Sequence, residues 1–215
     1  MTIRSKIFKH NLLQQFSLHL FAKRPIVGLR TLGDFKYNLA KRVALAALQI
    51  RLNVSGRGNG DVNFVEFNSL DSAREGCNIC SLDLTCASDD WESAIVSTVS
   101  AIHKLGKFGV TNSELERYSS ALLTDAQQLY SMENMVDGEA LGLSSNELLT
   151  GLMDTMSNNH QFMSAEEALV CTEAALTSLS VTEVGKAAAE LANHVLGLAD
   201  TKSKLESELI TVIAW

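Results

Sequence analysis

Proline, cysteine and long apolar runs are scarce in this sequence of 215 residues. A single proline, Pro25, excludes collagen-like proteins and proline-rich linkers. The chain has four cysteines, three of them between positions 77 and 86, which suits free thiols in a reducing intracellular compartment better than a secreted disulfide scaffold. No uninterrupted apolar run approaches the ~18 residues of a membrane span, so no span is expected. Nor does an apolar segment precede a small-residue cleavage site, as it would in a secretory signal.

Apolar residues make up 46% of the chain and charged residues 20%, which is typical of a globular protein of one large or two small domains. The charge is unevenly distributed, because residues 1–60 carry 11 of the 18 basic residues and one acid, Asp34. Such asymmetry is typical of a nucleic-acid-binding arm, a targeting segment or a basic element lying on an acidic surface. We favour the last interpretation, and we expect residues 1–33 to form a folded helix instead of a targeting segment.

Apolar residues in the first quarter of the chain recur at helical spacing. The spacing predicts a helix over Lys6–Phe21 that ends before Pro25. A second helix is predicted from Asp34, as its N-cap, to about Leu52, and a loop over Ser55–Gly60 follows it. We expect an apolar stripe of the first helix to be exposed surface that a neighbouring domain covers. It consists of Leu12, Phe16, Leu20 and Phe21.

Three segments have the composition or alternation of strands. Asn63–Phe67 is rich in β-forming residues, and positions 80–86 alternate apolar with polar side chains, as in a half-buried strand. Asn68–Gly76 is read as the charged connection between them, and Leu209–Trp215 is a third β-prone run. Two or three strands leave a sheet incomplete.

Residues 89–197 are predicted to form successive helices, because Ser, Thr or Asp precedes Glu by three residues at several points, as in an N-cap or capping box. The pairs are Asp89/Glu92, Thr111/Glu114, Ser144/Glu147, Ser164/Glu167 and Ser180/Glu183. Gly197 is placed just after a helix C-terminus. Helices and strands together predict an α+β domain.

Sequence patterns of known catalytic and metal sites are missing or incomplete. Cys77 and Cys80 have the spacing of a zinc or redox pair, but residues three apart in a strand point to opposite faces, so we interpret them as structural thiols. No His-x-x-Glu-His or His-Glu-x-x-His motif of a zinc protease occurs. Glu190 and His194 share a helix face, which favours a solvated or partly buried pair over a catalytic dyad. We therefore assign no catalytic, cofactor-binding or metal-binding residue.

Two glycine-containing segments and one basic helix also fail as functional motifs. Ser55–Gly60 follows a helix and precedes a strand, the reverse of a phosphate-binding loop. Gly142–Asn146 lacks the second glycine of a nucleophile elbow. The basic residues of the second predicted helix flank an apolar stripe, as on a solvated face, so we expect no nucleic-acid partner. They are Lys36, Lys41, Arg42 and Arg51.

Four segments, in their order and spacing, are similar to the non-catalytic second domain of chloroplast stromal processing peptidases. These belong to the pitrilysin/insulinase-type zinc metallopeptidases, the inverzincins. The segments are Phe8–Leu13 (FKHNLL), Leu29–Arg42 (LRTLGDFKYNLAKR), Ser69–Cys77 (SLDSAREGC) and Phe108–Tyr118 (FGVTNSELERY). GVTNSELERY resembles the family at large, whereas LGDF and DSAREGC point to the chloroplast branch. The similarity runs from about Ile7 to about Asp200.

The resemblance implies an antiparallel-dominated sheet covered by helices on one side, as in mitochondrial processing peptidase-like domains. Residues 1–200 would form the non-catalytic domain, and residues 201–215 a charged tail with a truncated strand. In this family zinc is held by a different domain, so we expect no cofactor in this chain and no activity from it alone. The implied compartment is the chloroplast stroma.

The expected function is that of a fragment of a zinc metalloendopeptidase that processes the transit peptides of imported precursors. The chain would contribute a wall of the substrate chamber and no catalysis. Its partners would be basic transit peptides, attracted by the acidic residues 61–215, or a catalytic peptidase domain. The alternative is a free-standing, non-catalytic binding or assembly subunit of an organellar complex.

Overall fold

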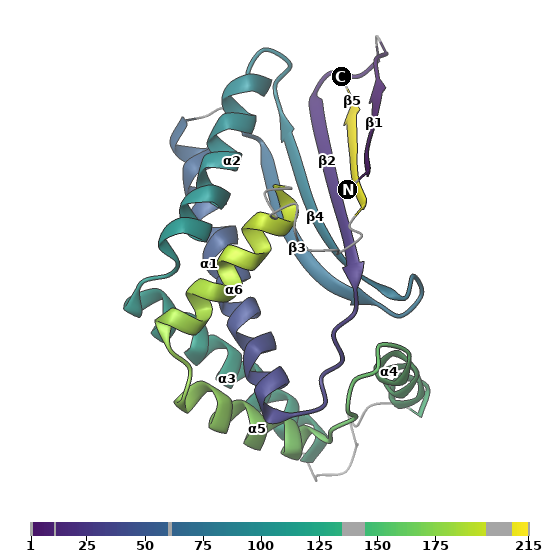
Figure 1. Ribbon diagram of the computed structural model, residues 1–215, viewed down its shortest axis with the longest axis vertical. Helices are drawn as coiled ribbons and strands as arrows, with labels where there is room; N and C mark the ends of the chain where they lie inside the picture. The colour runs from purple at the N-terminus through teal and green to yellow at the C-terminus, as the bar shows by residue number, and fades with distance from the viewer. Residues whose placement is uncertain (1, 11, 60–61, 135–144, 197–207, 215) are drawn as a thin grey trace.

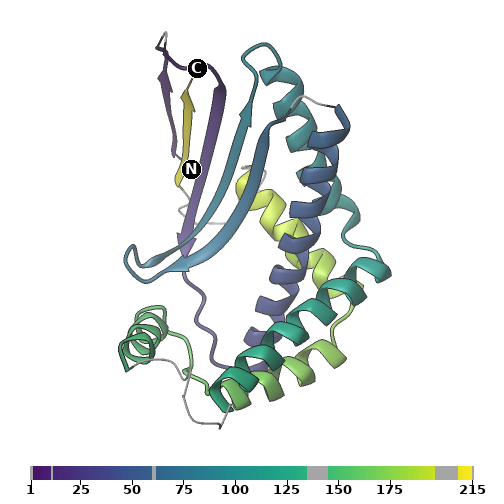
Figure 2. The same ribbon diagram turned by 180° about the vertical axis from the view of Figure 1, so that it is seen from behind.

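The computed structural model describes residues 2–10, 12–59, 62–134, 145–196 and 208–214. Five strands form one sheet in the order β1-β5-β2-β4-β3, and six helices accompany it in this part of the chain (Figures 1 and 2). The elements are β1 (Thr2–Phe8), β2 (Phe16–Pro25), α1 (Leu32–Asn59), β3 (Phe64–Ser72), β4 (Cys77–Cys86), α2 (Trp91–Phe108), α3 (Asn112–Asn134), α4 (Ser145–Ser157), α5 (Ala165–Thr177), α6 (Val181–Val195) and β5 (Glu208–Ala214).

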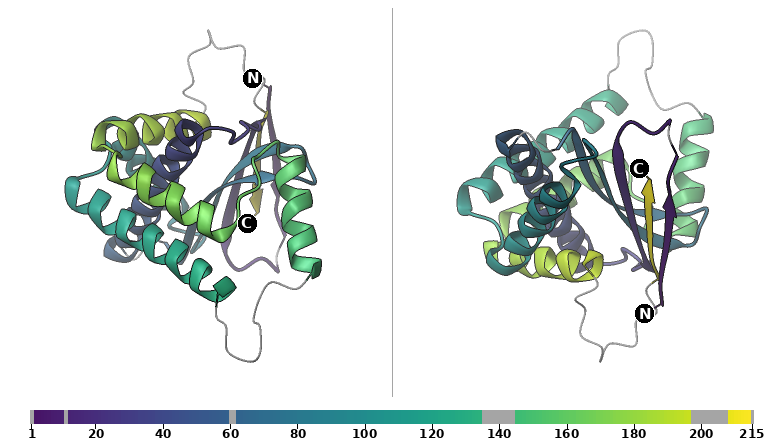
Figure 3. Two further views of the ribbon diagram at one scale, coloured as in Figure 1. Left: turned by 90° about the horizontal axis from the view of Figure 1, so that it is seen from below. Right: turned by 90° about the horizontal axis from the view of Figure 1, so that it is seen from above.

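Antiparallel pairing dominates the sheet. The pairs β2–β4, β3–β4 and β2–β5 are antiparallel, whereas β1 and β5 run parallel. Figure 3 shows the helices on one side of the sheet, apart from α4, which lies across the strands from them. The predicted α+β class with an antiparallel-dominated sheet is confirmed. No helix of the described residues is long and apolar enough to cross a membrane.

The predicted helix over Lys6–Phe21 is wrong, because these residues end β1, turn and begin β2. Phe16 and Leu18 are buried while Ser17 and His19 are half-buried, which is the alternation of a strand. Apolar residues four apart satisfy both a helical and a two-residue period, so the spacing was ambiguous. The expected exposed stripe does not exist as such, since Phe16 belongs to the core and Leu12 is exposed.

The third β-prone run is a strand, as predicted, and the sheet is larger than the sequence indicated. β5 lies between β1 and β2, with Val212 opposite both Lys6 and His19. The predicted domain boundary at residue 200 and the start of the charged tail fall outside the described residues. The predicted sheet was incomplete because β1 and β2, which overlap the segment mistaken for a helix, were missing from it.

The hairpin of β3 and β4 was predicted with its strands too short and its connection too long. β3 reaches Ser72, and β4 begins at Cys77. A tight turn joins them, in which the Gly76 N–H donates to the Ser72 carbonyl and Gly76 has a positive φ of 64°. Glycine adopts this conformation without the steric cost of a Cβ. The predicted alternation of β4 is confirmed, since every second residue from Asn78 to Cys86 is buried.

Helix α1 is longer than predicted at both ends. Thr31 caps it: the Asp34 N–H donates to Thr31 Oγ1, and the Thr31 N–H donates back to Asp34 Oδ2. Asp34 therefore lies in the first turn and is not the N-cap. At the other end the predicted loop Ser55–Gly60 is wrong as far as Asn59, because the helix continues through it.

Three predicted capping boxes are present. They join Thr111 to Glu114, Ser164 to Glu167 and Ser180 to Glu183. For the Asp89/Glu92 pair, the structure instead places Asp90 at the N-cap of α2 without a side-chain capping bond. Ser144, the side chain of Glu147 and Gly197 lie outside what the structure describes.

The core lies between the sheet and the helix layer. Helix α1 packs on β3, α6 on β2 and β4, and α2 packs against both α1 and α6. Helices α2 and α6 approach each other closely at Gly106 of α2, where a Cβ would lie 2.7 Å from the Cβ of Ala192 on α6. Strand β4 supplies four fully buried side chains to this core, Cys80, Leu82, Leu84 and Cys86.

Candidate functional site

A polar cavity of about 260 Å³ lies where the lower halves of β2, β3 and β4 face α1. Its walls include Arg24 from β2, Asp71 from β3, Asn78 from β4, and Tyr37 and Lys41 from α1. These side chains come from four elements because residues of the same face of the sheet point towards the helix. The cavity therefore interrupts an otherwise apolar interface with a concentration of charge.

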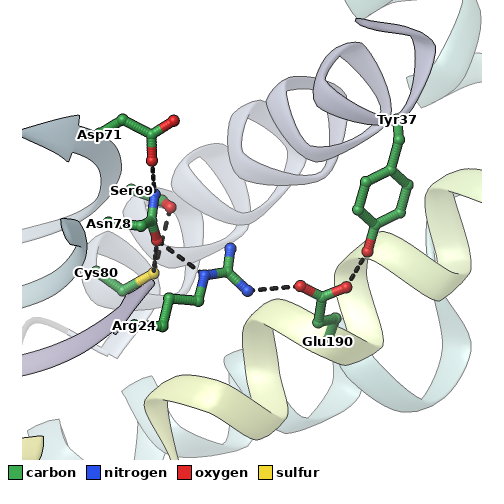
Figure 4. A network of polar contacts seen from close by, with 7 residues as sticks. All are labelled: Arg24, Tyr37, Ser69, Asp71, Asn78, Cys80 and Glu190. Atoms are coloured by element: carbon green, nitrogen blue, oxygen red, sulfur yellow. Dashed lines mark hydrogen bonds and ion pairs between the residues drawn. The ribbon is translucent and has the colours of Figure 1, made fainter. Parts of the chain in front are cut away.

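Arg24 connects three elements at this cavity (Figure 4). Its Nε donates to Asn78 Oδ1 at 2.9 Å, and its Nη1 donates to Glu190 Oε1 of α6 at 2.5 Å. The Tyr37 hydroxyl donates to the other oxygen of Glu190. The guanidinium, with 12% of its side chain exposed, is thereby neutralised in a partly dry environment.

A second chain of hydrogen bonds continues from Asn78 to the segment after α4. The Asn78 amide donates to Asp71 Oδ1 at 2.7 Å, and His160 Nε2 lies 3.2 Å from Asp71 Oδ2. His160 Nδ1 accepts a hydrogen bond from the Leu29 N–H, so Nε2 carries the proton that is donated to Asp71. Both oxygens of Asp71 are thus engaged.

The environment shifts the protonation of three groups here. Burial lowers the pKa of the Lys41 ammonium, and the Arg24 charge lowers it further. Burial and the bond to Glu190 raise the pKa of Tyr37 above its ordinary range. Burial acts to raise the pKa of Glu190, but the bonds from Tyr37 and Arg24 outweigh it and lower that pKa overall. Tyr37 therefore stays a donor and Glu190 an anionic acceptor across the neutral range.

Cys80, the thiol beside this network, lacks the environment of a reactive cysteine. Cys80 is buried beside Ser69, and burial raises the pKa of its thiol, the opposite of what a nucleophile needs. Among the residues that the structure describes, no group of three or more His, Cys, Asp or Glu side chains could hold a metal ion. The described residues thus do not fit the zinc of the resembled family.

The residues that spacing had brought together do not form the pairs considered from the sequence. Glu190 bonds to Arg24 and Tyr37, and no hydrogen bond or ion pair of the described residues joins it to His194, whose pKa is lowered by burial. Cys77 and Cys80 are free thiols on β4, and Cys80 is the buried one, as expected for structural thiols. Arg24, Tyr37, Asp71 and Asn78 were not singled out from the sequence, because no local spacing relates residues of separate elements.

Basic side chains of residues 1–60 pair with acids from the rest of the chain. The pairs are Lys23–Glu75, Arg24–Glu190, Lys36–Glu183 and Arg51–Glu114. This confirms the interpretation that the basic segment lies against an acidic surface. It also corrects the picture of Lys36 and Arg51 as ordinary solvated residues, since each is held by a carboxylate of another helix.

Comparison with known proteins relates the chain to one group of peptidases. The stromal processing peptidase of Arabidopsis thaliana is 35% identical over 184 residues, which are 84% of this chain and 14% of that protein. The stromal processing peptidase of Pisum sativum is 30% identical over 209 residues, 97% of this chain and 16% of that protein. The chain thus spans less than one fifth of the length of these relatives. No family model matches it.

Solved structures share the fold at low sequence identity. The first half of the periplasmic protease PqqL from Escherichia coli has a TM-score of 0.72 at 13% identity, with 98% of this chain and 42% of that chain covered. An inactive M16 peptidase domain from Pseudomonas fluorescens has a TM-score of 0.59 at 15% identity and the same coverage. The ferredoxin protease FusC, in complex with Arabidopsis ferredoxin, has a TM-score of 0.59 at 10% identity, with 98% of this chain and 20% of that chain covered.

The relatives found by sequence and the solved structures that share the fold are different proteins, but both sets are peptidases or peptidase domains. The resemblance inferred from the sequence is confirmed: the chain is related to the stromal processing peptidases and has the fold of an insulinase-type (M16) peptidase domain.

Proposed function

We propose that this chain is part of a zinc metalloendopeptidase that processes transit peptides in the chloroplast stroma, where it forms a wall of the substrate chamber and takes no part in catalysis. The observation that carries the proposal is the identity of 30–35% to chloroplastic stromal processing peptidases over 84–97% of the chain. The absence of the inverted zinc motif from the sequence supports the non-catalytic role.

Electrostatics supports a basic peptide as the ligand. Residues 61–215 carry 24 acids and 7 basic residues, and the four ion pairs with the basic segment engage four of those acids. Other carboxylates remain exposed on the helices, among them Glu116, Asp125, Glu166 and Glu173. Their field would attract a basic, acid-poor peptide over about a Debye length, roughly 10 Å at 0.1 M salt.

The test is binding of a fluorescent basic transit peptide to the 215-residue chain, measured by anisotropy at low and high salt. The control is the same peptide with its basic residues replaced by glutamine. We expect binding that weakens with salt for the basic peptide alone, and no cleavage with or without zinc. Equal binding of both peptides would contradict the chamber-wall role. Cleavage that a chelator abolishes would contradict the non-catalytic role.

A further inference from the structure

Lys41 is a half-buried cation with no carboxylate partner among the described residues. Its Nζ lies 4.8 Å from the centroid of the Tyr37 ring, a cation–π contact, and it lines the polar cavity. The ion pairs of the described residues engage Lys23, Arg24, Lys36 and Arg51, but not Lys41. An ammonium has three donors, and partial burial makes unused donors costly.

The acids nearest to Lys41 are occupied by other groups. Glu190 accepts from Arg24 with one oxygen and from Tyr37 with the other. Asp71 accepts from Asn78 with one oxygen and faces His160 with the other. The cavity therefore holds a cation whose hydrogen-bond donors remain available to a ligand.

The outer edge of β3 is capped by a side chain over its first half, but its main-chain groups beside the cavity are uncapped among the described residues. Gln49 of α1 caps this first half, since its amide donates to the Val65 carbonyl at 2.9 Å and accepts from the Phe67 N–H at 3.0 Å. Main-chain groups of alternate residues point to the same edge, so those of Ser69 and Asp71 point outwards too. No side chain of the described residues caps these two, and both residues line the cavity.

We propose that the cavity binds the carboxylate of a polypeptide segment that lies against the Ser69–Asp71 edge of β3, with the Lys41 ammonium as its charged partner. Main-chain hydrogen bonds to an open edge are one general way to hold an extended peptide. A cavity of about 260 Å³ is small for a whole ligand but suits one residue of a chain. The proposal deepens the proposed function, from which it takes the polypeptide as ligand class.

The pH dependence of binding follows from the charges around Lys41. Arg24 on β2 repels it, while Glu190 on α6 and Asp71 on β3 attract it. Asp34 and Arg42 of α1, of opposite charge, also line the cavity, and Cys80 and Tyr37 are neutral at pH 7. Burial and Arg24 lower the pKa of the free ammonium below 10.5. Because the bound carboxylate needs the charged form, affinity falls as the pH rises through that lowered pKa.

Calorimetric titration of the 215-residue chain with three short N-acetylated peptides of one apolar sequence tests this. The first has a free C-terminal carboxylate, the second a C-terminal amide, and the third an amide with one internal glutamate. We expect one carboxylate-bearing probe to bind at least about tenfold more tightly than the neutral amide, as a partly desolvated ion pair provides. The α-carboxylate and the side-chain carboxylate are distinguished by which probe binds. Equal affinity for all three overturns the proposal.

Substitution of the lysine locates the site. Lys41→Met keeps the length of the stem and should abolish the preference for carboxylate, whereas Lys41→Arg should keep most of it. Lys107→Met is the matched control, because Lys107 also lies over a ring, that of Phe108 at 5.3 Å, but does not line the cavity. A preference that survives Lys41→Met overturns the proposal.

A peptide without carboxylates separates this inference from the proposed function. Salt-dependent binding of a C-terminally amidated, acid-free basic transit peptide to the unmodified chain reports the exposed acids alone, because that peptide offers no carboxylate to Lys41. Carboxylate binding without transit-peptide binding by the unmodified chain would contradict the proposed function alone.

Discussion

The interface between α1 and the sheet has an apolar half and a polar half, although the same helix and strands form both. In the apolar half, Leu48 and Leu52 of α1 belong to the same buried cluster as Leu82 and Leu84 of β4. In the polar half, Asn78 occupies an equally inward position on β4, yet it bonds to Arg24 and Asp71, and Arg24 bonds in turn to Glu190.

The difference shows that the burial of a position on β4 and the polarity of the side chain placed there are determined by different features of the sequence. The two-residue alternation of β4 decides which side chains point inwards, and it is unbroken from Asn78 to Cys86. The side-chain type then decides whether an inward position needs partners. The apolar half needs close packing, whereas the polar half needs each donor matched to an acceptor, and Lys41 is where that matching is incomplete.

The largest effect is expected in the apolar half. Leu84→Ala removes a fully buried side chain and leaves a cavity, so the free energy of unfolding should fall by about 2–5 kcal/mol. Urea denaturation followed by circular dichroism measures this change. Val96→Ala on α2, where the valine is 65% exposed, is the control and should change stability by less than about 0.5 kcal/mol. A similar loss in both variants would contradict a dry, close-packed interface.

A smaller loss is expected when the polar half is broken. Glu190→Ala removes the acceptor of both Arg24 and Tyr37 and leaves a guanidinium with 12% exposure without its carboxylate. Loss of one partner of a partly buried charged pair should cost about 1–3 kcal/mol. Glu190→Gln, which keeps one acceptor, should lose less. If both variants unfold like the unmodified chain in urea, the Arg24 network is not part of the stability of the fold.

The two halves also differ in how far the sequence reveals them. The alternation of β4 and the capping boxes at Thr111, Ser164 and Ser180 are local patterns, and each was predictable within a few residues. The cavity is not local, because Arg24 and Glu190 are 166 residues apart and meet only when β2 and α6 pack. No periodicity in one segment encodes such a meeting.

One global property of the sequence did anticipate the polar half. The excess of basic residues in positions 1–60 and of acids after them predicted that the two parts lie together, and four ion pairs confirm it. Which cation meets which acid could not be predicted. Because Lys6–Phe21 was predicted as a helix, the strand β2, which carries Arg24, was not recognised. The position of Arg24 beside α1 could therefore not be predicted.

Acid should weaken the polar contacts and leave the apolar half unaffected. The Lys36 ammonium, followed by the Ser180 hydroxyl and N–H, lowers the pKa of Glu183 to about 2. A carboxyl whose pKa is lowered by folding stabilises the fold above its unfolded pKa, near 4.5, and this contribution is lost as the pH falls towards 2. Glu183→Gln should therefore reduce the loss of stability between pH 5 and 2, measured by urea denaturation at several pH values. An unchanged pH profile would contradict the shift.

The smallest effect on stability is expected at Lys41, which sharpens the contrast with Leu84. The ammonium is half-buried without a carboxylate partner, so its charge carries a desolvation cost that no ion pair of the described residues offsets. Lys41→Met keeps the apolar stem, loses the cation–π contact of about 0.5–1 kcal/mol and removes that cost, so the free energy of unfolding should change by less than about 1 kcal/mol. Urea denaturation beside Lys107→Met checks this. A loss as large as that of Leu84→Ala would show that Lys41 serves the fold, which would remove the reason to assign its free donors to a ligand.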